Sequence, residues 1–318
     1  MTGNKVPKIS LVVPMYNESE NVDAFMAELI PALERIGPDF EIIAVDDGST
    51  DDGVEKLEKL RERDGRIKIV QFRTNFGQTA AFSAGFDKAT GDIIITIDAD
   101  LQNDPADIPA MIEKLNEGYD IVAGWRHDRK DAFINRKLPS MIANRVISMT
   151  TNVHLHDYGC SLKVFRREVV KNIRLYGEMH RFIPAIASWM GVSVAEMRVN
   201  HRPRAAGVSK YGIGRTVRVL LDLMTVKFLL SYSTRPIQIF GLIGLGSGLI
   251  GFIIAAWVSF QRLFMDMPLF NRPILLLAVL LIFIGVQFIS MGLLAELQAR
   301  TYHESQNKPT YVIKRVWD

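Results

Sequence analysis

Residues 93–100 read IIITIDAD, an apolar run that ends abruptly in two acidic residues. A continuous run of β-branched residues is typical of a strand that is buried on both faces of a sheet. Because successive side chains of a strand point to opposite faces, Asp98 and Asp100 begin on the same face. The stretch therefore predicts a buried strand that delivers two carboxylates to one edge of a sheet.

Similar apolar runs recur before and after this strand and alternate with helical patterns. The runs are residues 9–14, 40–45, 67–72, 92–97 and 119–123, and apolar residues at helical spacing occupy residues 22–36, 53–63, 78–88 and 106–116. This alternation predicts an α/β, Rossmann-like domain with a mostly parallel sheet and right-handed helical crossovers. In such a sheet, ligands bind beyond the carboxyl ends of the strands.

The two carboxylates of the opening stretch form a candidate metal site. Carboxylate oxygens are hard ligands that suit Mg²⁺ or Mn²⁺. An Asp-x-Asp pair also occurs in solvated loops, but this pair follows a buried strand at the edge where ligands bind. Gln102 is either a further oxygen ligand or the start of the next helix. We therefore expect Asp98 and Asp100 to hold a divalent cation together with a diphosphate.

Two further polar segments follow predicted strands. Asp46 and Asp47 end the second strand, and their carboxylates can accept hydrogen bonds from a nucleobase edge or from ribose hydroxyls. Residues 49–51 can cap the next helix, which is compatible with that role. Residues 16–18, Tyr-Asn-Glu, offer an aromatic face and polar acceptors, although alone they are an ordinary strand-to-helix loop. Together these segments predict a nucleotide site.

The C-terminal third carries an apolar surplus that a soluble enzyme does not need. Hydrophobic residues make up 48% of the chain, and the excess is concentrated after Arg235. Residues 237–260 and 273–294 contain no charged side chain. Each run is long enough to cross a hydrocarbon core about 30 Å thick. We interpret both as transmembrane helices, joined by residues 261–272 into a hairpin.

Lysine and arginine residues indicate the orientation of this hairpin. Seven lie in residues 202–235 and four after Leu294, but only two in residues 261–272. The positive-inside rule then places the α/β domain and the C-terminus in the cytoplasm, at the inner membrane. The single cysteine, Cys160, leaves no intrachain disulfide and fits a reducing compartment. Residues 1–10 lack the apolar region of a signal peptide.

We expect four segments along the chain. Residues 1–213 form the α/β domain, 214–235 an amphipathic helix on the bilayer surface, 236–298 the hairpin, and 299–318 a cytoplasmic tail. The alternative for the second segment is a core helix of the α/β domain. The glycines of the first span suit helix contacts in lipid rather than a dinucleotide loop, and such faces favour a homo-oligomer. The net charge of +3 is too small to imply nucleic-acid binding.

Four segments of the sequence resemble glycosyltransferase family 2 enzymes of the GT-A fold, and they occur in the same order. They are Val12-Val13-Pro14-Met15-Tyr16-Asn17-Glu18, Val45-Asp46-Asp47-Gly48-Ser49-Thr50-Asp51, Arg73-Thr74-Asn75-Phe76-Gly77-Gln78 and Asp98-Ala99-Asp100-Leu101-Gln102. Within that family the whole chain resembles the polyprenyl-phosphate glycosyltransferases. These include dolichyl-phosphate mannose synthases and, more closely, bacterial undecaprenyl-phosphate glucosyltransferases with two C-terminal spans.

The resemblance implies three sets of site residues. The nucleotide sugar would contact Pro14, Tyr16, Asn17, Glu18, Asp46, Asp47, Gln78 and Asp98, and the metal would be held by Asp98, Asp100 and Gln102. The acceptor phosphate would contact Arg126, Arg136, Ser140, Arg204, Ser209 and Lys210. Cationic side chains suit a lipid phosphate, whereas the alternative for each is solvation or attraction to anionic headgroups. Trp125 stands where relatives usually have a small residue.

Asp157 resembles the aspartate proposed as catalytic in this subfamily. A phosphate monoester with a second pKa near ~6 is already largely an oxyanion at neutral pH. We therefore expect Asp157 to orient the nucleophile or its basic partners rather than to abstract a proton. Direct attack of the phosphate on the anomeric carbon predicts inversion, so an α-linked donor gives a β-linked product.

The resemblance implies transfer of a hexose, with UDP-glucose as the expected donor and undecaprenyl phosphate as the expected acceptor. Other donors, such as GDP-mannose or a UDP-aminosugar, are alternatives. A processive polysaccharide synthase is a weaker alternative, because its Gln-x-x-Arg-Trp motif is absent. A non-catalytic membrane anchor or lipid flippase is the alternative from another class, and it leaves the strand-end carboxylates unexplained.

Overall fold

The chain folds into two compact units, which we call the α/β unit and the hairpin unit. The computed structural model describes residues 7–127, 153–173, 175, 179–203, 237–265, 268, 273–305 and 311–318. Residues 1–226 and 309–318 belong to the α/β unit, and residues 227–308 belong to the hairpin unit. The α/β unit therefore includes residues from both sides of the hairpin unit in the sequence.

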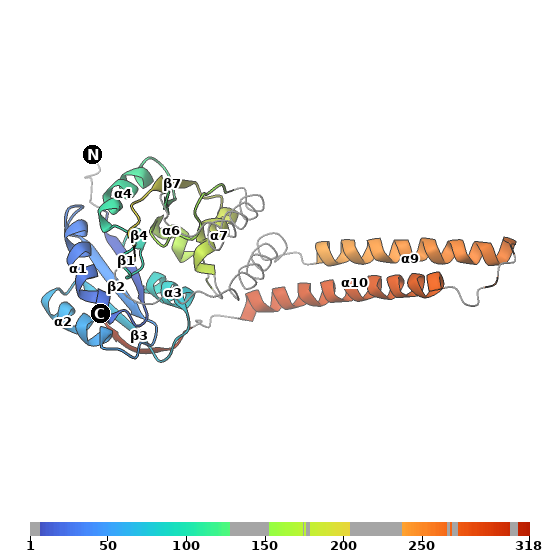
Figure 1. The fold of residues 1–318 in the computed structure, drawn as a ribbon, viewed down its shortest axis with the longest axis horizontal. Coiled ribbons are helices and arrows are strands. Elements are labelled where there is room, and N and C mark those ends of the chain that lie inside the picture. Colours follow the sequence, from blue (N-terminus) through green and yellow to red (C-terminus); the bar gives the residue numbers. More distant parts are fainter. Residues whose placement is uncertain are drawn as a thin grey trace. The chain divides into compact units, whose positions relative to one another are not determined.

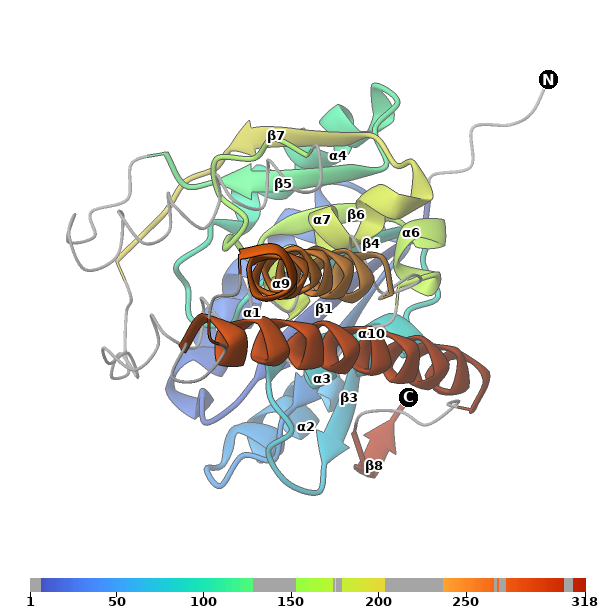
Figure 2. The same cartoon turned by 90° about the vertical axis from the view of Figure 1, so that its right-hand side faces the viewer.

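The α/β unit is built on an eight-stranded mixed sheet (Figures 1 and 2). Its strands are β1 (Ile9–Met15), β2 (Phe40–Asp46), β3 (Ile67–Phe72), β4 (Ile93–Thr96), β5 (Ile121–Trp125), β6 (Lys163–Arg166), β7 (Val194–Arg198) and β8 (Ile313–Trp317). The order is β7-β5-β6-β4-β1-β2-β3-β8, which runs from the top to the bottom of Figure 2. The pairs β1–β2, β1–β4, β2–β3 and β5–β7 are parallel, whereas β6 and β8 pair antiparallel with their neighbours. The expected α/β class with a mostly parallel sheet is confirmed.

Helices cover both faces of this sheet. They are α1 (Ser19–Glu34), α2 (Gly53–Arg63), α3 (Gln78–Lys88), α4 (Ile108–Asn116), α6 (Arg167–Lys171) and α7 (Ile183–Ala187), with the short 3₁₀ turns η1 (Pro105–Asp107), η3 (Met179–Phe182) and η4 (Ser188–Met190). Leu11 and Val13 join the core beneath α1 and α4. Val12 points to the opposite face, where a Cβ on Gly85 of α3 would lie 2.1 Å from Val12 Cγ1. Glycine thus lets α3 approach the centre of the sheet closely.

The element bounds follow the local sequence patterns closely. α2 and α3 span the predicted residues, and β1 and β2 each extend one residue farther than predicted. The predicted helix 106–116 instead begins as η1, because Pro105 starts the turn and the Asp104 carboxylate accepts a hydrogen bond from the amide of Ala106 at 3.0 Å. The strand β6 lies between β4 and β5.

The C-terminal segment contains an element that the sequence interpretation did not include. Residues 299–318 were expected to form a tail, but α10 continues to Ser305 and β8 then pairs with β3. Trp317 of β8 packs against the core of the α/β unit. β8 thereby covers the hydrogen-bonding edge that β3 would otherwise expose.

The hairpin unit consists of two long apolar helices, α9 (Ile237–Met265) and α10 (Pro273–Ser305). Within them, Phe240–Met265 and Pro273–Ala295 are long and apolar enough to cross a membrane. The helices approach closely through glycines, since a Cβ on either Gly244 or Gly285 would lie 2.6 Å from the carbonyl oxygen of the other. This agrees with helix packing through small residues.

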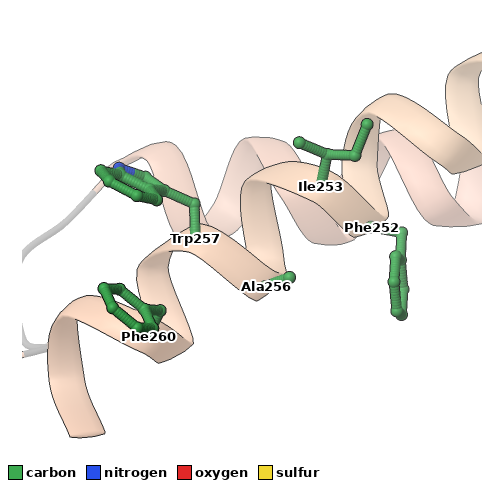
Figure 3. Close-up of a pocket in the computed structure, with 5 residues that line it drawn as sticks. All are labelled: Phe252, Ile253, Ala256, Trp257 and Phe260. Carbon is green, nitrogen blue, oxygen red and sulfur yellow. The ribbon is translucent and has the colours of Figure 1, made fainter. Parts of the chain in front are cut away.

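One side of α9 carries a shallow apolar depression (Figure 3). It is lined by Phe252, Ile253, Ala256, Trp257 and Phe260. None of these side chains is charged, so the depression offers no group for acid, base or metal chemistry. The candidate site lies in the α/β unit instead.

Candidate functional site

The carboxyl ends of β1, β2 and β4 meet at one edge of the sheet. β1 lies between the other two and pairs parallel with both, so that Met15 stands opposite Asp46, and Val12 stands opposite Thr96. The chain leaving β4 continues this alignment, because the amide of Ile97 donates to the carbonyl of Val12 at 3.3 Å. The tyrosine-containing loop, the Asp46 segment and the Asp98 segment therefore emerge together, as the topology predicts.

Asp98 and Asp100 lie in a tight turn directly after β4. The side-chain amide of Gln78, at the start of α3, donates to Asp98 Oδ1 at 2.7 Å, and the backbone amide of Gln102 donates to Asp100 Oδ1 at 3.2 Å. The next residue, Leu101, has φ = +60°, a conformation that costs a non-glycine residue about 1 kcal/mol or more. The contacts around the turn must offset this cost, because a relaxed chain would leave this conformation.

The electrostatics of this turn suit a divalent cation. Burial and, to a smaller extent, the neighbouring Asp100 carboxylate raise the pKa of Asp98 to about 6, although Ser161, Lys163 and Arg126 oppose the shift. A bound cation would relieve the repulsion between two partly desolvated carboxylates. No group of three or more His, Cys, Asp or Glu side chains suited to a metal occurs among the described residues. Two carboxylates leave most of the coordination sphere of Mg²⁺ or Mn²⁺ open, so a metal held here would take its remaining ligands from other groups, among which the sequence predicts the Gln102 side chain.

Asp46 and Asp47 have different partners although they are neighbours. The Asp46 carboxylate accepts a hydrogen bond from the amide of Ser49 at 3.2 Å. Asp47 accepts two, from the amides of Phe76 at 2.7 Å and Gly77 at 2.9 Å. Burial raises the pKa of both carboxyls against these hydrogen bonds. Asp47 therefore anchors the loop after β3, while Asp46, the last residue of β2, accepts from one backbone amide.

The loop after β1 is fixed to the start of α2. Asn17 has φ = +54°. Its side-chain oxygen accepts a hydrogen bond from the backbone amide of Thr50 at 2.9 Å, and its backbone amide donates to Ser49 Oγ at 2.9 Å. Glu18 accepts a hydrogen bond from the Asn21 side chain at 2.6 Å. Pro14 and Tyr16 are both half-buried on either side of Met15. Asn17 thus links this loop to the segment that follows Asp46.

Arg126 and Asp157 form a buried, bidentate ion pair. Arg126 Nε lies 2.7 Å from Asp157 Oδ2, and Arg126 Nη2 lies 3.0 Å from Asp157 Oδ1. Asp157 is only 4% exposed. Burial alone would lower the pKa of Arg126, but the Asp157 carboxylate offsets this and raises it above its usual value. The guanidinium is therefore a fixed positive charge whose direction is set by Asp157.

Lys163 is a site residue that the sequence reasoning missed. It is 3% exposed at the start of β6, and its ammonium group donates to the carbonyl of Cys160. Its pKa is lowered by burial, and the charges of Cys160, Asp157 and Asp98 oppose that shift. A lysine inside the apolar run 162–165 is the signal that would have identified it, because such a residue is rarely buried without a partner.

Trp125 lies between two charged or polar neighbours at the end of β5. Its ring stacks on His156 at a centroid distance of 4.2 Å, and the Arg198 guanidinium lies 5.0 Å from the ring centroid. The carboxylate of Glu196 is 2.7 Å from His156 Nδ1. These contacts give the large ring a defined place beside Arg126.

The remaining predicted acceptor residues lie outside the described residues. They are Arg136, Ser140, Arg204, Ser209 and Lys210. Of the predicted acceptor set, Arg126 is the member that the structure places, next to Asp157 and near Asp98.

Comparison with known proteins gives a family and several full-length relatives. The family model described as "Glycosyl transferase family 2" matches residues 10–174. A dodecaprenyl-phosphate galacturonate synthase of Rhizobium johnstonii is 44% identical, over 98% of this chain and 93% of its own length. An undecaprenyl-phosphate 4-deoxy-4-formamido-L-arabinose transferase of Pseudomonas aeruginosa is 38% identical, over 97% and 90%, and one of Klebsiella pneumoniae is 37% identical, over 99% and 95%.

Solved structures share the fold of the α/β unit at much lower identity. Glucosyl-3-phosphoglycerate synthase of Mycobacterium tuberculosis aligns with a TM-score of 0.53 at 17% identity, over 70% of this chain and 80% of that chain. The same enzyme in complex with Mn²⁺ and UDP-glucose aligns with a TM-score of 0.53 at 18% identity, over 70% and 79%. At this identity the likeness concerns the fold alone.

Proposed function

The chain belongs to glycosyltransferase family 2, and from this premise we propose that it transfers a sugar from a nucleoside diphosphate to a polyprenyl phosphate. The observation that carries the proposal is the charge arrangement around Asp98. Asp98, one of two acidic side chains suited to a cation, interacts electrostatically with two buried cations, Arg126 and Lys163. Such a site can hold a nucleotide diphosphate through a metal and a second phosphate through fixed positive charge. As a glycosyltransferase, the protein is not the non-catalytic anchor considered as an alternative.

In the proposed reaction each residue set has one task. A divalent cation held by Asp98, Asp100 and Gln102 would neutralise charge on the departing diphosphate. Asp46 and residues 14–18 would bind the nucleoside. Arg126, oriented by Asp157, would hold the acceptor phosphate. A phosphate oxygen forms a bond to the anomeric carbon as the bond from that carbon to the diphosphate oxygen breaks, and the nucleoside diphosphate leaves. Single displacement inverts the anomeric configuration.

Asp157 acts in this scheme as a positioning residue. Both of its carboxylate oxygens are engaged by the Arg126 guanidinium. The acceptor needs no strong base, because a phosphate monoester with a second pKa near ~6 is already ionised at neutral pH. We therefore assign Asp157 to fixing Arg126 rather than to proton transfer.

The names of the relatives favour a donor sugar other than the glucose that the sequence resemblance implied. The relatives are named for galacturonate and for 4-deoxy-4-formamido-L-arabinose, and none of those reported above that cover the full chain is named for glucose. We propose galacturonate as the donor sugar, because that relative has the higher identity, and a 4-formamido pentose as the alternative. Both differ from glucose at the C4 to C6 side of the ring.

The test is a transfer assay with the purified full chain in detergent. The donors are UDP-galacturonate, UDP-4-deoxy-4-formamido-L-arabinose and UDP-glucose, the acceptors are dodecaprenyl and undecaprenyl phosphate, and the metals are Mn²⁺ and Mg²⁺. We expect a β-linked lipid product from α-linked UDP-galacturonate, and none from the Asp98→Asn, Asp100→Asn double variant. An α-linked product would contradict single displacement, and nucleotide binding without lipid product would contradict the acceptor assignment.

We further propose that the hairpin unit inserts in the inner membrane with both of its ends in the cytoplasm. The α/β unit holds residues on both sides of the hairpin in sequence, so an even number of spans is required. In a Cys160→Ser background, Pro268→Cys should react with an impermeant thiol reagent on intact spheroplasts. Lys59→Cys, in the exposed face of α2, should react only after permeabilisation. The reverse pattern would contradict this topology.

We also propose that the chain forms a homo-oligomer. Measurement of its molecular mass in detergent tests this proposal.

A further inference from the structure

The C-terminal strand β8 pairs with β3 as far as the loop 73–77, which connects β3 to α3. Ile313 stands opposite Phe72, with a register irregularity between Gln71 and Phe72. The pairing reaches one residue beyond the end of β3, because the amide of Arg73 donates to the carbonyl of Val312 at 3.0 Å. The last residues of the chain therefore hold the first residue of the loop 73–77.

Tyr311 extends this contact from the backbone to the aromatic side chains. Its ring stacks on Phe72 with a centroid distance of 5.1 Å and an interplanar angle of 12°, and its hydroxyl donates to Asp87 Oδ2 at 2.7 Å. Phe72 in turn meets Phe76 edge to face at 5.8 Å. Tyr311 is thus fixed at both ends, between the end of β3 and the end of α3.

The loop 73–77 is joined directly to the Asp46 segment. The Phe76 and Gly77 amides donate to the two carboxylate oxygens of Asp47. On the same side, a Cβ on Gly48, which has φ = +73°, would lie 2.5 Å from the carbonyl carbon of Thr74. The loop and the segment are therefore packed without spare room, so that a displacement of one displaces the other.

We propose that β8, through Tyr311, is a positioning element of the donor site. It holds the loop 73–77 in the conformation in which Asp47 and Gly48 fix the strand end beside Asp46. The proposal rests on the nucleotide-binding role proposed above for Asp46. It assigns a function to a segment that follows the hairpin unit in sequence, so that the donor site is complete only when the chain has returned from the hairpin to the α/β unit.

The contacts at the chain end support this assignment. The Arg61 guanidinium donates to the carbonyl oxygen of Asp318, and Lys88 Nζ lies 4.0 Å from the Asp318 carboxylate. These cations lie in the last turns of α2 and α3. β8 is thus anchored at both of its ends, by Tyr311 at the loop 73–77 and by Asp318 at the ends of these two helices.

The experiment compares Tyr311→Ala, Tyr311→Phe and Tyr119→Ala in the full chain in detergent. Tyr119 is a half-buried tyrosine that packs against the core after α4, so its variant controls for general loss of stability. The first readout is hydrogen exchange of the Phe76 and Gly77 amides. The second is calorimetric binding of UDP with Mn²⁺, which needs no lipid acceptor.

We expect Tyr311→Ala to speed hydrogen exchange of both amides. We also expect it to weaken UDP binding about tenfold, which is the effect of losing one aromatic contact together with its packing. Tyr311→Phe keeps the ring stacked on Phe72 and loses only the exposed hydrogen bond to Asp87. Its UDP affinity should therefore stay within about threefold of that of the wild type. Tyr119→Ala should leave both readouts unchanged at temperatures well below its melting point.

Unchanged exchange at Phe76 and Gly77 in Tyr311→Ala would overturn the proposal, as would faster exchange with unaltered UDP affinity. Equal effects of Tyr119→Ala would also overturn it. Failure of the proposed function has a different signature: the wild type itself would bind no UDP or transfer no sugar, while the exchange result would still report the coupling between β8 and the loop.

Discussion

Replacement of Asp157 by asparagine tests the assignment of this residue to the orientation of Arg126. Asparagine has nearly the same shape, but it removes the negative charge that neutralises a buried guanidinium. It keeps one oxygen, so one of the two hydrogen bonds at 2.7 and 3.0 Å survives and the other is lost. Breaking a buried ion pair by removing one partner costs ~3–5 kcal/mol, and the surviving bond places this variant at the low end, ~3 kcal/mol.

The same quantity predicts a kinetic effect. If the misplaced guanidinium weakens acceptor phosphate binding in the transition state by most of ~3 kcal/mol, kcat/KM for polyprenyl phosphate falls roughly 100-fold. The KM for the nucleotide sugar should change little, because the side chain that Asp157 orients, Arg126, is assigned to the acceptor phosphate. The assay is the initial rate of product lipid formation with each substrate varied in turn, alongside urea unfolding of each variant.

A double-mutant cycle with Arg126→Met isolates the interaction between the two side chains. The double variant leaves neither partner of the ion pair buried alone. Its loss of unfolding free energy should therefore be smaller than the sum of the two single losses by about 2 kcal/mol or more. Glu34→Gln is the control, since it breaks an exposed ion pair with Arg66 and should cost less than about 1 kcal/mol. Additive losses, or near-normal turnover of Asp157→Asn, would refute the reasoning.

Three further predictions follow from the charges in the α/β unit. The raised pKa of Asp98, about 6, means that a proton competes with the metal, so Mn²⁺ affinity measured by calorimetry should fall up to about tenfold per pH unit below 6 and level off above it. Lys163→Met removes a charge that lowers the pKa of Asp98, so the midpoint of that profile should move to higher pH, and an unmoved midpoint would contradict the proximity of the two groups. Burial raises the pKa of Glu41, but hydrogen bonds from Ser10, Thr90 and Lys68 outweigh it and lower the pKa from 4.5 to about 2. The ionised Glu41 carboxylate therefore contributes about 3 kcal/mol to the free energy of unfolding above pH 4.5, and this contribution is lost as the pH falls towards 2. Urea unfolding at pH 7 should show the same loss for Glu41→Gln.

Local sequence determined the elements and the places of several candidate site residues at their ends. β1, β2 and α2 follow from runs whose period and length depend on neighbouring residues alone. The position of Asp98 and Asp100 at a strand end follows in the same way, because the apolar run before them ends at a fixed residue. The two long apolar helices are also local features, since the length and composition of each run are enough to identify a helix that could cross a membrane.

Tertiary structure decided which of these residues act together. Asp157 meets Arg126 because β6 inserts antiparallel between β4 and β5, a pairing between segments far apart in sequence that no local pattern encodes. The same insertion buries Lys163 beside Asp98. β8 joins the sheet for a similar reason, since a short amphipathic segment has the same pattern whether it pairs with β3 or extends into solvent. Periodicity is a property of neighbouring residues, whereas strand order and the partners of buried charges depend on the free energy of the whole packed sheet.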